Sequence, residues 1–178
     1  MDSFESIVKT IFESRGYWVQ SSYKVCLTKE EKREIGKPSS PRRELDLVAY
    51  KGSTNEILAI ECKSLLDSPG VQIQSFTGGK GSDKYKMFND DKLREVVFRR
   101  MKIQLMEDGL CKANPKIKLC LATGKVTTQR DRDELEKHFS QKGWHLYSDK
   151  WIKENLLQLS ESGYENEVSI VTTKILSR

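Results

Sequence analysis

Two short apolar segments separated by four turn residues constrain the fold of this chain more than any other feature. The segments are ELDLVAYK (residues 44–51) and EILAIECKS (residues 56–64), and GSTN (residues 52–55) lies between them. Branched and aromatic residues are typical of strands, whereas glycine, serine and asparagine are typical of turns. The pattern predicts a β-hairpin of two adjacent antiparallel strands.

The predicted hairpin carries three charged residues in a mostly apolar setting. If it turns symmetrically about residues 53 and 54, Asp46 lies directly opposite Glu61. Side chains alternate along a strand, so Glu61 and Lys63 share one face, Asp46 joins them, and the Cys62 thiol points away. Two acids that face each other repel, and a divalent cation bound between them removes this cost.

Hard oxygen ligands of this kind predict Mg²⁺, for which Mn²⁺ substitutes. The Cys62 carbonyl is a further candidate ligand beside Asp46 and Glu61. An amine at position 63 would orient or deprotonate a water, or stabilise negative charge on a phosphate. Hydrolysis of a phosphodiester uses all three groups. The alternative interpretation is a structural cluster of ion pairs without a metal.

The rest of the chain alternates helical and strand patterns, and we expect one domain over residues 1–178. An apolar stripe from Phe4 to Phe12 predicts an N-terminal helix, and residues 17–27 predict a strand. The later segments are helix 90–108, strand 116–123, helix 130–142, strand 144–147, helix 148–159 and a possible terminal strand 168–176. Segments 28–43 and 67–89 are polar or rich in glycine and proline, and we expect flexible loops there. This order predicts an α/β fold with a mixed sheet.

A helix, a strand, an aspartate on the next strand and Glu-x-Lys on the third resemble the PD-(D/E)XK nuclease superfamily. The resemblance covers residues 5–64, and beyond them it rests on the order of elements alone. Leu45 stands where the motif has a proline, a position that varies widely in the superfamily. The resemblance implies a restriction-endonuclease-like three-layer fold, with a central mixed sheet flanked by helices.

The resemblance also implies site residues and a substrate. Asp46 and Glu61 would bind the metal and Lys63 would be the catalytic lysine of a Mg²⁺-dependent endonuclease acting on DNA. Glu5, on the first turn of the first helix, matches a glutamate that reaches the metal in many members, although such a helical glutamate is also commonplace.

Several polar residues near the predicted site are candidates for nucleic-acid contact, because ammonium and guanidinium groups bind phosphates. They are Lys37, Arg42, Arg43, Gln72, Gln74, Lys80 and Lys84. Basic residues at positions 94, 99, 100 and 102 form a further candidate surface. For each set the alternative is an ordinary solvated surface. The GGKGS run at residues 78–82 departs from the spacing of a phosphate-binding loop, so a flexible loop is expected.

Composition limits the other possibilities. The formal net charge of +5 is compatible with a polyanionic partner without requiring one. The four cysteines show no paired spacing and the chain has only two histidines, which disfavours a structural zinc site. We expect the cysteines to be reduced thiols. The acidic N-terminus and the lack of a long apolar run predict a cytoplasmic protein without a membrane partner.

Two rival functions remain open from the sequence. The chain is either an active nuclease or a catalytically silent DNA-binding module with the same fold. A variant of the nuclease interpretation is that the chain is a subunit that cleaves only within a larger complex. A homodimer is also possible, since symmetric dimers are the usual route to double-strand cleavage.

Overall fold

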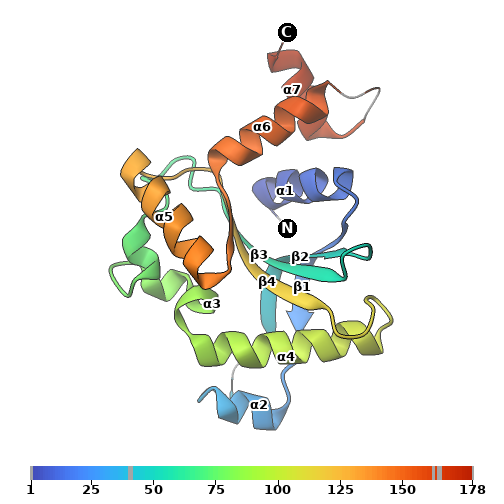
Figure 1. Ribbon diagram of the computed structural model, residues 1–178, viewed down its shortest axis with the longest axis vertical. Coiled ribbons are helices and arrows are strands. Elements are labelled where there is room, and N and C mark those ends of the chain that lie inside the picture. Colours follow the sequence, from blue (N-terminus) through green and yellow to red (C-terminus); the bar gives the residue numbers. More distant parts are fainter. Residues whose placement is uncertain (1, 40–41, 162, 164–165, 178) are drawn as a thin grey trace.

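The computed structural model describes residues 2–39, 42–161, 163 and 166–177, and its centre is a five-stranded mixed β-sheet (Figure 1). The spatial order of the strands is β1-β2-β3-β4-β5. β1, β2 and β3 pair antiparallel, and β3, β4 and β5 pair parallel. The strands are β1 (Trp18–Val25), β2 (Arg43–Lys51), β3 (Glu56–Lys63), β4 (Lys116–Thr123) and β5 (His145–Tyr147).

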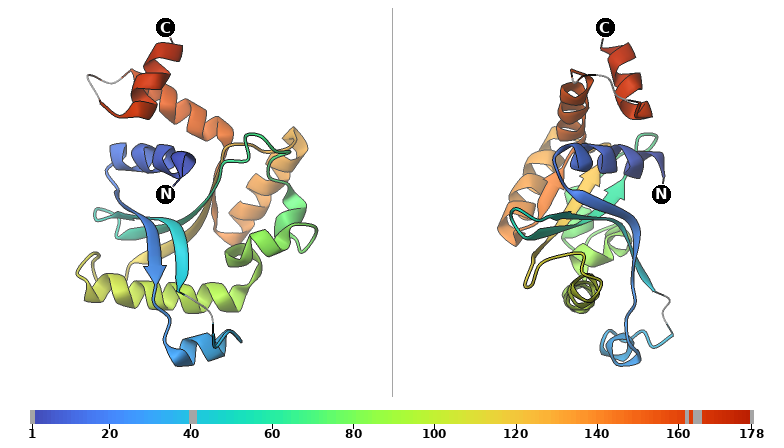
Figure 2. Two further views of the ribbon diagram at one scale, coloured as in Figure 1. Left: turned by 180° about the vertical axis from the view of Figure 1, so that it is seen from behind. Right: turned by 90° about the vertical axis from the view of Figure 1, so that its right-hand side faces the viewer.

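Helices lie on both faces of this sheet, so the predicted α/β class is confirmed (Figure 2). One layer contains α1 (Ser3–Ser14) and α6 (Asp149–Ser160), with α7 (Val168–Leu176) against α6. The opposite layer contains α3 (Lys86–Asn89), α4 (Asp91–Glu107) and α5 (Gln129–Lys142). The shorter elements are α2 (Lys29–Glu34), η1 (Ile73–Phe76) and η2 (Ser82–Lys84).

The β2–β3 hairpin has the register that the symmetric turn predicts. Lys51 pairs with Glu56 and Leu47 pairs with Ile60. The alternation of side chains then sends Leu58 and Ile60 into the core beneath α1, and Ile57 into the core against α4.

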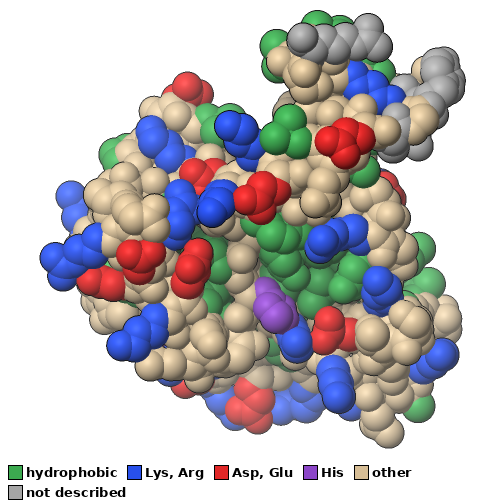
Figure 3. Space-filling model, turned by 45° about the horizontal axis from the view of Figure 1, so that its top comes forward, with side chains coloured by type: hydrophobic (Ala, Val, Ile, Leu, Met, Phe, Trp, Pro, Cys, Tyr) green, Lys and Arg blue, Asp and Glu red, His purple; other side chains and the backbone are tan. Residues whose placement is uncertain are grey.

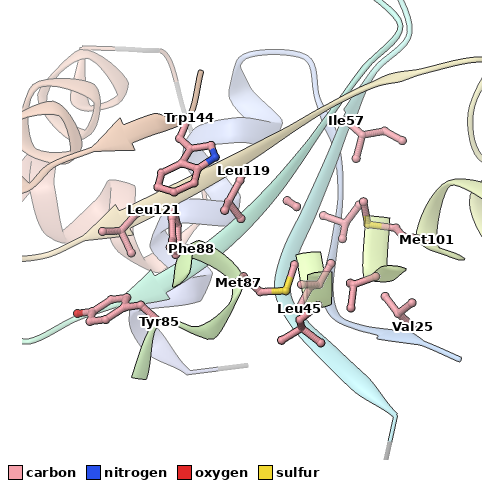
Figure 4. Packing of buried hydrophobic residues seen from close by; sticks show 14 of the residues in the cluster. Val25, Leu45, Ile57, Tyr85, Met87, Phe88, Met101, Leu119, Leu121 and Trp144 are labelled. Carbon is pink, nitrogen blue, oxygen red and sulfur yellow. The ribbon is translucent and has the colours of Figure 1, made fainter. Parts of the chain in front are cut away.

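The core against α4 is the larger of the two and is dominated by aromatic and long aliphatic side chains (Figure 4). Phe88 contacts Trp144 edge to face with ring centroids 5.2 Å apart, and Phe139 lies 5.3 Å from Phe88. Met87 and Met101 are fully buried there. These contacts tie α3, α4 and α5 to one face of the sheet.

The alternation breaks at one point on β2, next to the predicted site. Leu45 packs in the core against α4, whereas Leu47 packs beneath α1, although residues two apart on a regular strand share a face. On β1 the residue between the pairs Ser21–Leu47 and Tyr23–Leu45 is Ser22, whose φ is +51°. A left-handed residue locally reorients the strand. Asp46 therefore lies at the point where the alternating side chains of β2 change from one face of the sheet to the other.

The segments expected to be loops contain helices. Within residues 28–43, Thr28 caps α2 by a reciprocal bond with Glu31, and Ser40 and Pro41 lie outside the described residues. Residues 67–89 contain η1, η2 and α3, and bury Phe76, Tyr85 and Phe88. Local sequence was misleading because long-range contacts order both segments: ion pairs to α4 hold α2, and aromatic contacts hold residues 67–89.

The possible terminal strand over residues 168–176 is wrong, since this segment forms α7. Its many β-branched residues favour a strand, but in the described part of the structure no sheet edge pairs with it. Only Ile170 of this helix is buried, and α7 packs on α6. Tertiary contact has overridden intrinsic propensity. Among the residues that the structure describes, no helix is both long and apolar enough to cross a bilayer.

Candidate active site

The hairpin brings Asp46 and the end of β3 into direct contact. The backbone N–H of Cys62 donates a hydrogen bond of 2.7 Å to Asp46 Oδ2. This bond fixes one carboxylate oxygen beside the segment that carries Glu61 and Lys63. It also leaves the second oxygen, Oδ1, for another partner.

The Lys63 ammonium lies among three oxygens. Lys63 Nζ is 3.1 Å from the Cys62 carbonyl oxygen, 3.5 Å from Glu61 Oε1 and 3.8 Å from Asp46 Oδ2. These oxygens belong to the same three groups that the sequence nominates as metal ligands. Their lone pairs therefore converge on one cation. We refer to Asp46, Glu61 and Lys63 together as the site cluster.

The site cluster is neither fully buried nor freely solvated. The exposed fraction of the side chain is 26% for Asp46, 15% for Glu61 and 28% for Lys63. The cluster is thus open to solvent on one side, while the partial burial strengthens charge interactions within it.

Glu61 is held against an electrostatic cost. Burial raises the pKa of its carboxyl above the ordinary value, and the negative charge of Asp46 raises it further. The positive charges of Lys63 and Arg43 oppose these effects and lower the pKa, although the net shift is upward. A second cation close to the carboxylates would relieve the same cost.

Arg43, the first residue of β2, lies close enough to the site cluster for its positive charge to act on Glu61. Its Nε is buried and, among the described residues, is one of three such side-chain atoms without a hydrogen-bond partner. A buried guanidinium nitrogen with an unused donor is suited to an oxyanion that arrives with a ligand.

Tyr85 is a neighbour of Glu61 that sequence reasoning missed. Burial and the charge of Glu61 together raise the pKa of its phenol to about 12. Figure 4 shows its ring beside the end of β3 with the hydroxyl directed outward. The residue lies in the segment expected to be a loop, and no local pattern marks it.

Glu5, the further candidate ligand, lies on the first turn of α1, close enough to the site cluster for the charge of Asp46 to act on its carboxyl. Its carboxylate accepts a 3.1 Å bond from the Asp2 N–H in the capping box that begins α1. Burial is the main cause that raises the pKa of Glu5, and the charge of Asp46 adds to it. Within the described residues, no three His, Cys, Asp or Glu side chains are grouped closely enough to hold a metal.

The donor set that remains fits a hard divalent cation. Two carboxylates and one backbone carbonyl match the oxygen ligands of Mg²⁺, which usually keeps several waters. The Cys62 thiol points away as expected, into the core beneath α1. All four cysteines are free thiols.

The other predicted contact residues lie at varying distances from the site cluster. Lys37 is half-exposed after α2, and Arg42 is exposed directly before Arg43. Lys80 and Lys84 are exposed around η2. Among the described residues, none of these four side chains forms a hydrogen bond or ion pair with the site cluster.

Gln72 and Gln74 belong to a different part of the surface. Their side chains hydrogen-bond to each other, and they line a shallow cleft with the start of α5. Arg130, Asp131 and Glu134 form the remaining walls of that cleft.

The basic face of α4 is largely neutralised by α2. Arg100 Nε contacts both carboxylate oxygens of Glu31 at 3.1 and 2.9 Å. Glu34 pairs with Lys92 and Arg99 at 2.6 Å each. The surface in Figure 3 likewise interleaves both signs of charge, without one broad basic patch on the face shown.

Comparison of the chain with protein-family models, with curated proteins and with solved structures found no match in any of the three. The assignment of function therefore depends on the geometry of the site itself.

Proposed function

We propose that this chain is a metal-dependent endonuclease that hydrolyses phosphodiester bonds of DNA, with a restriction-endonuclease-like fold. The observation that carries the proposal is the convergence of Asp46 Oδ2, Glu61 Oε1 and the Cys62 carbonyl on one ammonium within 3.8 Å. The mixed sheet, with Asp46 on β2 and Glu-x-Lys on β3, agrees with that superfamily's arrangement.

Asp46, Glu61 and the Cys62 carbonyl would hold Mg²⁺ or Mn²⁺ at this point. When bound, the ion supplies Lewis-acid polarisation of the phosphate and acidifies a water. The Cys62 N–H keeps Asp46 oriented for this role, because its hydrogen bond occupies one lobe of the carboxylate.

Lys63 would act on the attacking water or on the charge that develops on the phosphate. In the absence of a metal its ammonium offsets one of the two negative charges, and a bound cation would release it toward substrate. Arg43 contributes a second positive charge close to Glu61, which would lower the cost of bringing a phosphate to the site.

A second candidate is a catalytically silent nucleic-acid-binding module. The ion pairs between Lys63 and both carboxylates favour it, since Lys63 and Arg43 together supply two positive charges for the two acids without a metal. Phosphate contact through Arg43 would remain possible in such a module.

Incubation of the protein with supercoiled, linear, single-stranded and four-way-junction DNA separates the two candidates. The nuclease is expected to cleave with Mg²⁺ or Mn²⁺ and to stop with EDTA. Lys63→Ala should lower the rate by about 10²- to 10⁴-fold, as expected for a lost acid–base group. The exposed Lys137 on α5 provides the matched control, and Lys137→Ala should cleave normally.

The silent module instead predicts DNA binding without cleavage under every metal condition. Binding without cleavage would reject the enzyme, unless addition of a partner protein restores a Lys63-dependent activity. A larger complex or a homodimer is therefore tested by the same assay, repeated across protein concentrations.

A further inference from the structure

We propose that a second contact for nucleic acid lies away from the site cluster, on an aromatic surface formed by Tyr17, Tyr147 and Trp151, and that it binds the unpaired bases of a single strand. This inference rests on the proposed action on nucleic acid and specifies the form of nucleic acid that is bound.

The three rings form one continuous surface on the α1 and α6 side of the sheet. Tyr147 and Trp151 lie with ring centroids 4.5 Å apart. Phe12 supports them from below, with its centroid 5.7 Å from Trp151 and 5.4 Å from Tyr17. Phe12 is 1% exposed, whereas the three rings above it are all partly exposed.

Two cations already lie over the faces of these rings. The Arg15 guanidinium is 5.2 Å from the Trp151 centroid, and Lys51 Nζ is 5.0 Å from the Tyr17 centroid. Lys51 also donates a 3.0 Å bond to the Arg15 carbonyl, which holds the end of β2 beside the end of α1. Both positive groups are thus positioned next to an aromatic plane.

A third cation borders the surface on β4. Lys118 Nζ lies 3.0 Å from His145 Nε2 and 3.3 Å from Glu56 Oε2. The His145 ring stacks on Tyr147 at 28° with centroids 6.1 Å apart, which extends the aromatic surface along β5. Glu56 pairs with Lys118, so Arg15 and Lys51 are the two cations that lie directly over the rings.

Figure 3 shows hydrophobic side chains that gather in a hollow beside a histidine, with Lys, Arg and acidic side chains around it. A polyanion with flat apolar groups complements such a surface. Bases stack on aromatic rings with little dependence on sequence, and ammonium and guanidinium groups meet the phosphates between them. The bases of an intact duplex are already stacked and paired, so they cannot reach the rings.

The aromatic surface lies at the C-terminal end of α1, whereas the site cluster lies near the N-terminal end of α1 at the edge of the sheet, with Glu61 on the face opposite α1. Glu5, whose carboxyl feels the charge of Asp46, is on the first turn, and Arg15 follows the last. The intervening helix is about 15 Å long at a rise of ~1.5 Å per residue. A strand with ~3.4 Å between nucleotides covers that length in roughly four or five nucleotides. The expected ligand is therefore DNA with an unpaired segment near the cleavage position.

The test uses the full chain in EDTA, with a fluorescent thymidine oligonucleotide about ten nucleotides long, and measures anisotropy over a range of salt concentrations. The variant Arg15→Ala/Lys51→Ala keeps every ring and removes two border cations. We expect it to bind at least about tenfold more weakly. The slope of log K against log salt should also become shallower by about 1.4, since each single-strand phosphate contact contributes ~0.7.

The matched control removes two exposed lysines elsewhere, as Lys29→Ala/Lys137→Ala on α2 and α5, and should bind like the unmodified chain. Trp151→Phe should lose the quenching of tryptophan fluorescence on addition of oligonucleotide, with unchanged circular dichroism. If the Arg15/Lys51 variant and the lysine control bind alike, or if duplex competes as well as single strand, the proposal is overturned.

This outcome is separable from the failure of the proposed enzyme activity. If the chain cleaves DNA with metal but the Arg15/Lys51 variant binds single strands normally, only the aromatic surface is rejected. Variant-sensitive binding with no cleavage rejects the nuclease and leaves the aromatic surface supported.

Discussion

The 2.7 Å hydrogen bond from the Cys62 N–H to Asp46 Oδ2 extends the contact between β2 and β3 beyond the backbone pair Leu47–Ile60. It joins two residues that are sixteen positions apart in the sequence. Through it, the carboxylate on one strand is oriented by the backbone of the strand that carries Glu61 and Lys63. The candidate site is therefore a property of the hairpin and its register.

Replacement of Asp46 by asparagine tests whether this carboxylate binds a metal. The amide oxygen introduced by Asp46→Asn can still accept the Cys62 N–H bond, so the fold should persist, but the charge that attracts Mg²⁺ is lost. At a Mg²⁺ concentration about tenfold above Kd, the unmodified chain should gain about 1.4 kcal/mol of unfolding free energy. Thermal melting with and without Mg²⁺ measures the difference. An equal gain in Asp46→Asn would exclude this carboxylate as a ligand.

Stability without metal should depend on pH through Glu61. Its pKa is raised in the folded state, so the folded protein binds this proton more tightly than the unfolded chain. Stability should consequently fall as pH rises from the ordinary value of 4.5 through the raised pKa, and the loss is complete above it. In EDTA, Glu61→Gln should remove this part of the pH dependence. Urea denaturation across that range checks it, and identical slopes for both proteins would contradict the expectation.

The pair Glu31–Arg100 should stabilise the attachment of α2 to α4. Burial raises the pKa of Glu31, but hydrogen bonds from Arg100 and the Thr28 N–H outweigh it, and the pKa falls below 4.5. The contribution of ionised Glu31 to the free energy of unfolding is present above pH 4.5 and is lost as pH falls through the lowered pKa. Arg100→Ala should cost about 1.5–3 kcal/mol at pH 7, as is typical of hydrogen bonds to charged groups.

A double-mutant cycle with Glu31→Gln isolates this pair from other effects of each substitution. The coupling between the two positions should be present at pH 7 and should disappear in acid. The solvent-exposed pair Arg130–Glu134 on α5 is a matched control, and its coupling should be much weaker because water and salt screen it. Equal coupling in the two pairs would contradict a special role for Glu31.

Gly124, directly after β4, should not tolerate a side chain. A Cβ at this position would lie 2.3 Å from the Ser64 carbonyl oxygen, next to Lys63. Backbone must move to admit it, and overpacking of this kind costs about 1–3 kcal/mol. Gly163→Ala is the control, because a Cβ there meets no atom of the described residues within 4 Å. Chemical denaturation of both variants should show a lower free energy of unfolding for Gly124→Ala only.

Local pattern was sufficient for most elements because their hydrophobic periodicity was strong. Residues 116–123 form β4 as predicted, and the helix expected from Asp90 or Asp91 begins at Asp91 with Asp90 as its cap. It failed for 168–176, where β-branched residues favoured a strand. The local pattern also failed for residues 67–89, which it predicted to be a loop. The aromatic residues of this segment, Phe76, Tyr85 and Phe88, are buried in a cluster of rings that includes the distant Phe139 and Trp144.

The sequence by itself determined the hairpin, its register, and hence the meeting of Asp46, Glu61 and Lys63. A short turn between two alternating strands leaves few other pairings, because a slip by one residue would expose every core side chain. Tertiary structure alone decided which other groups surround that cluster. Arg43 and Tyr85 approach Glu61, and Tyr17 before β1 and Trp151 of α6 both meet Phe12 of α1, because separate elements pack on a common sheet. Such contacts join residues far apart in the chain, and no local periodicity encodes them.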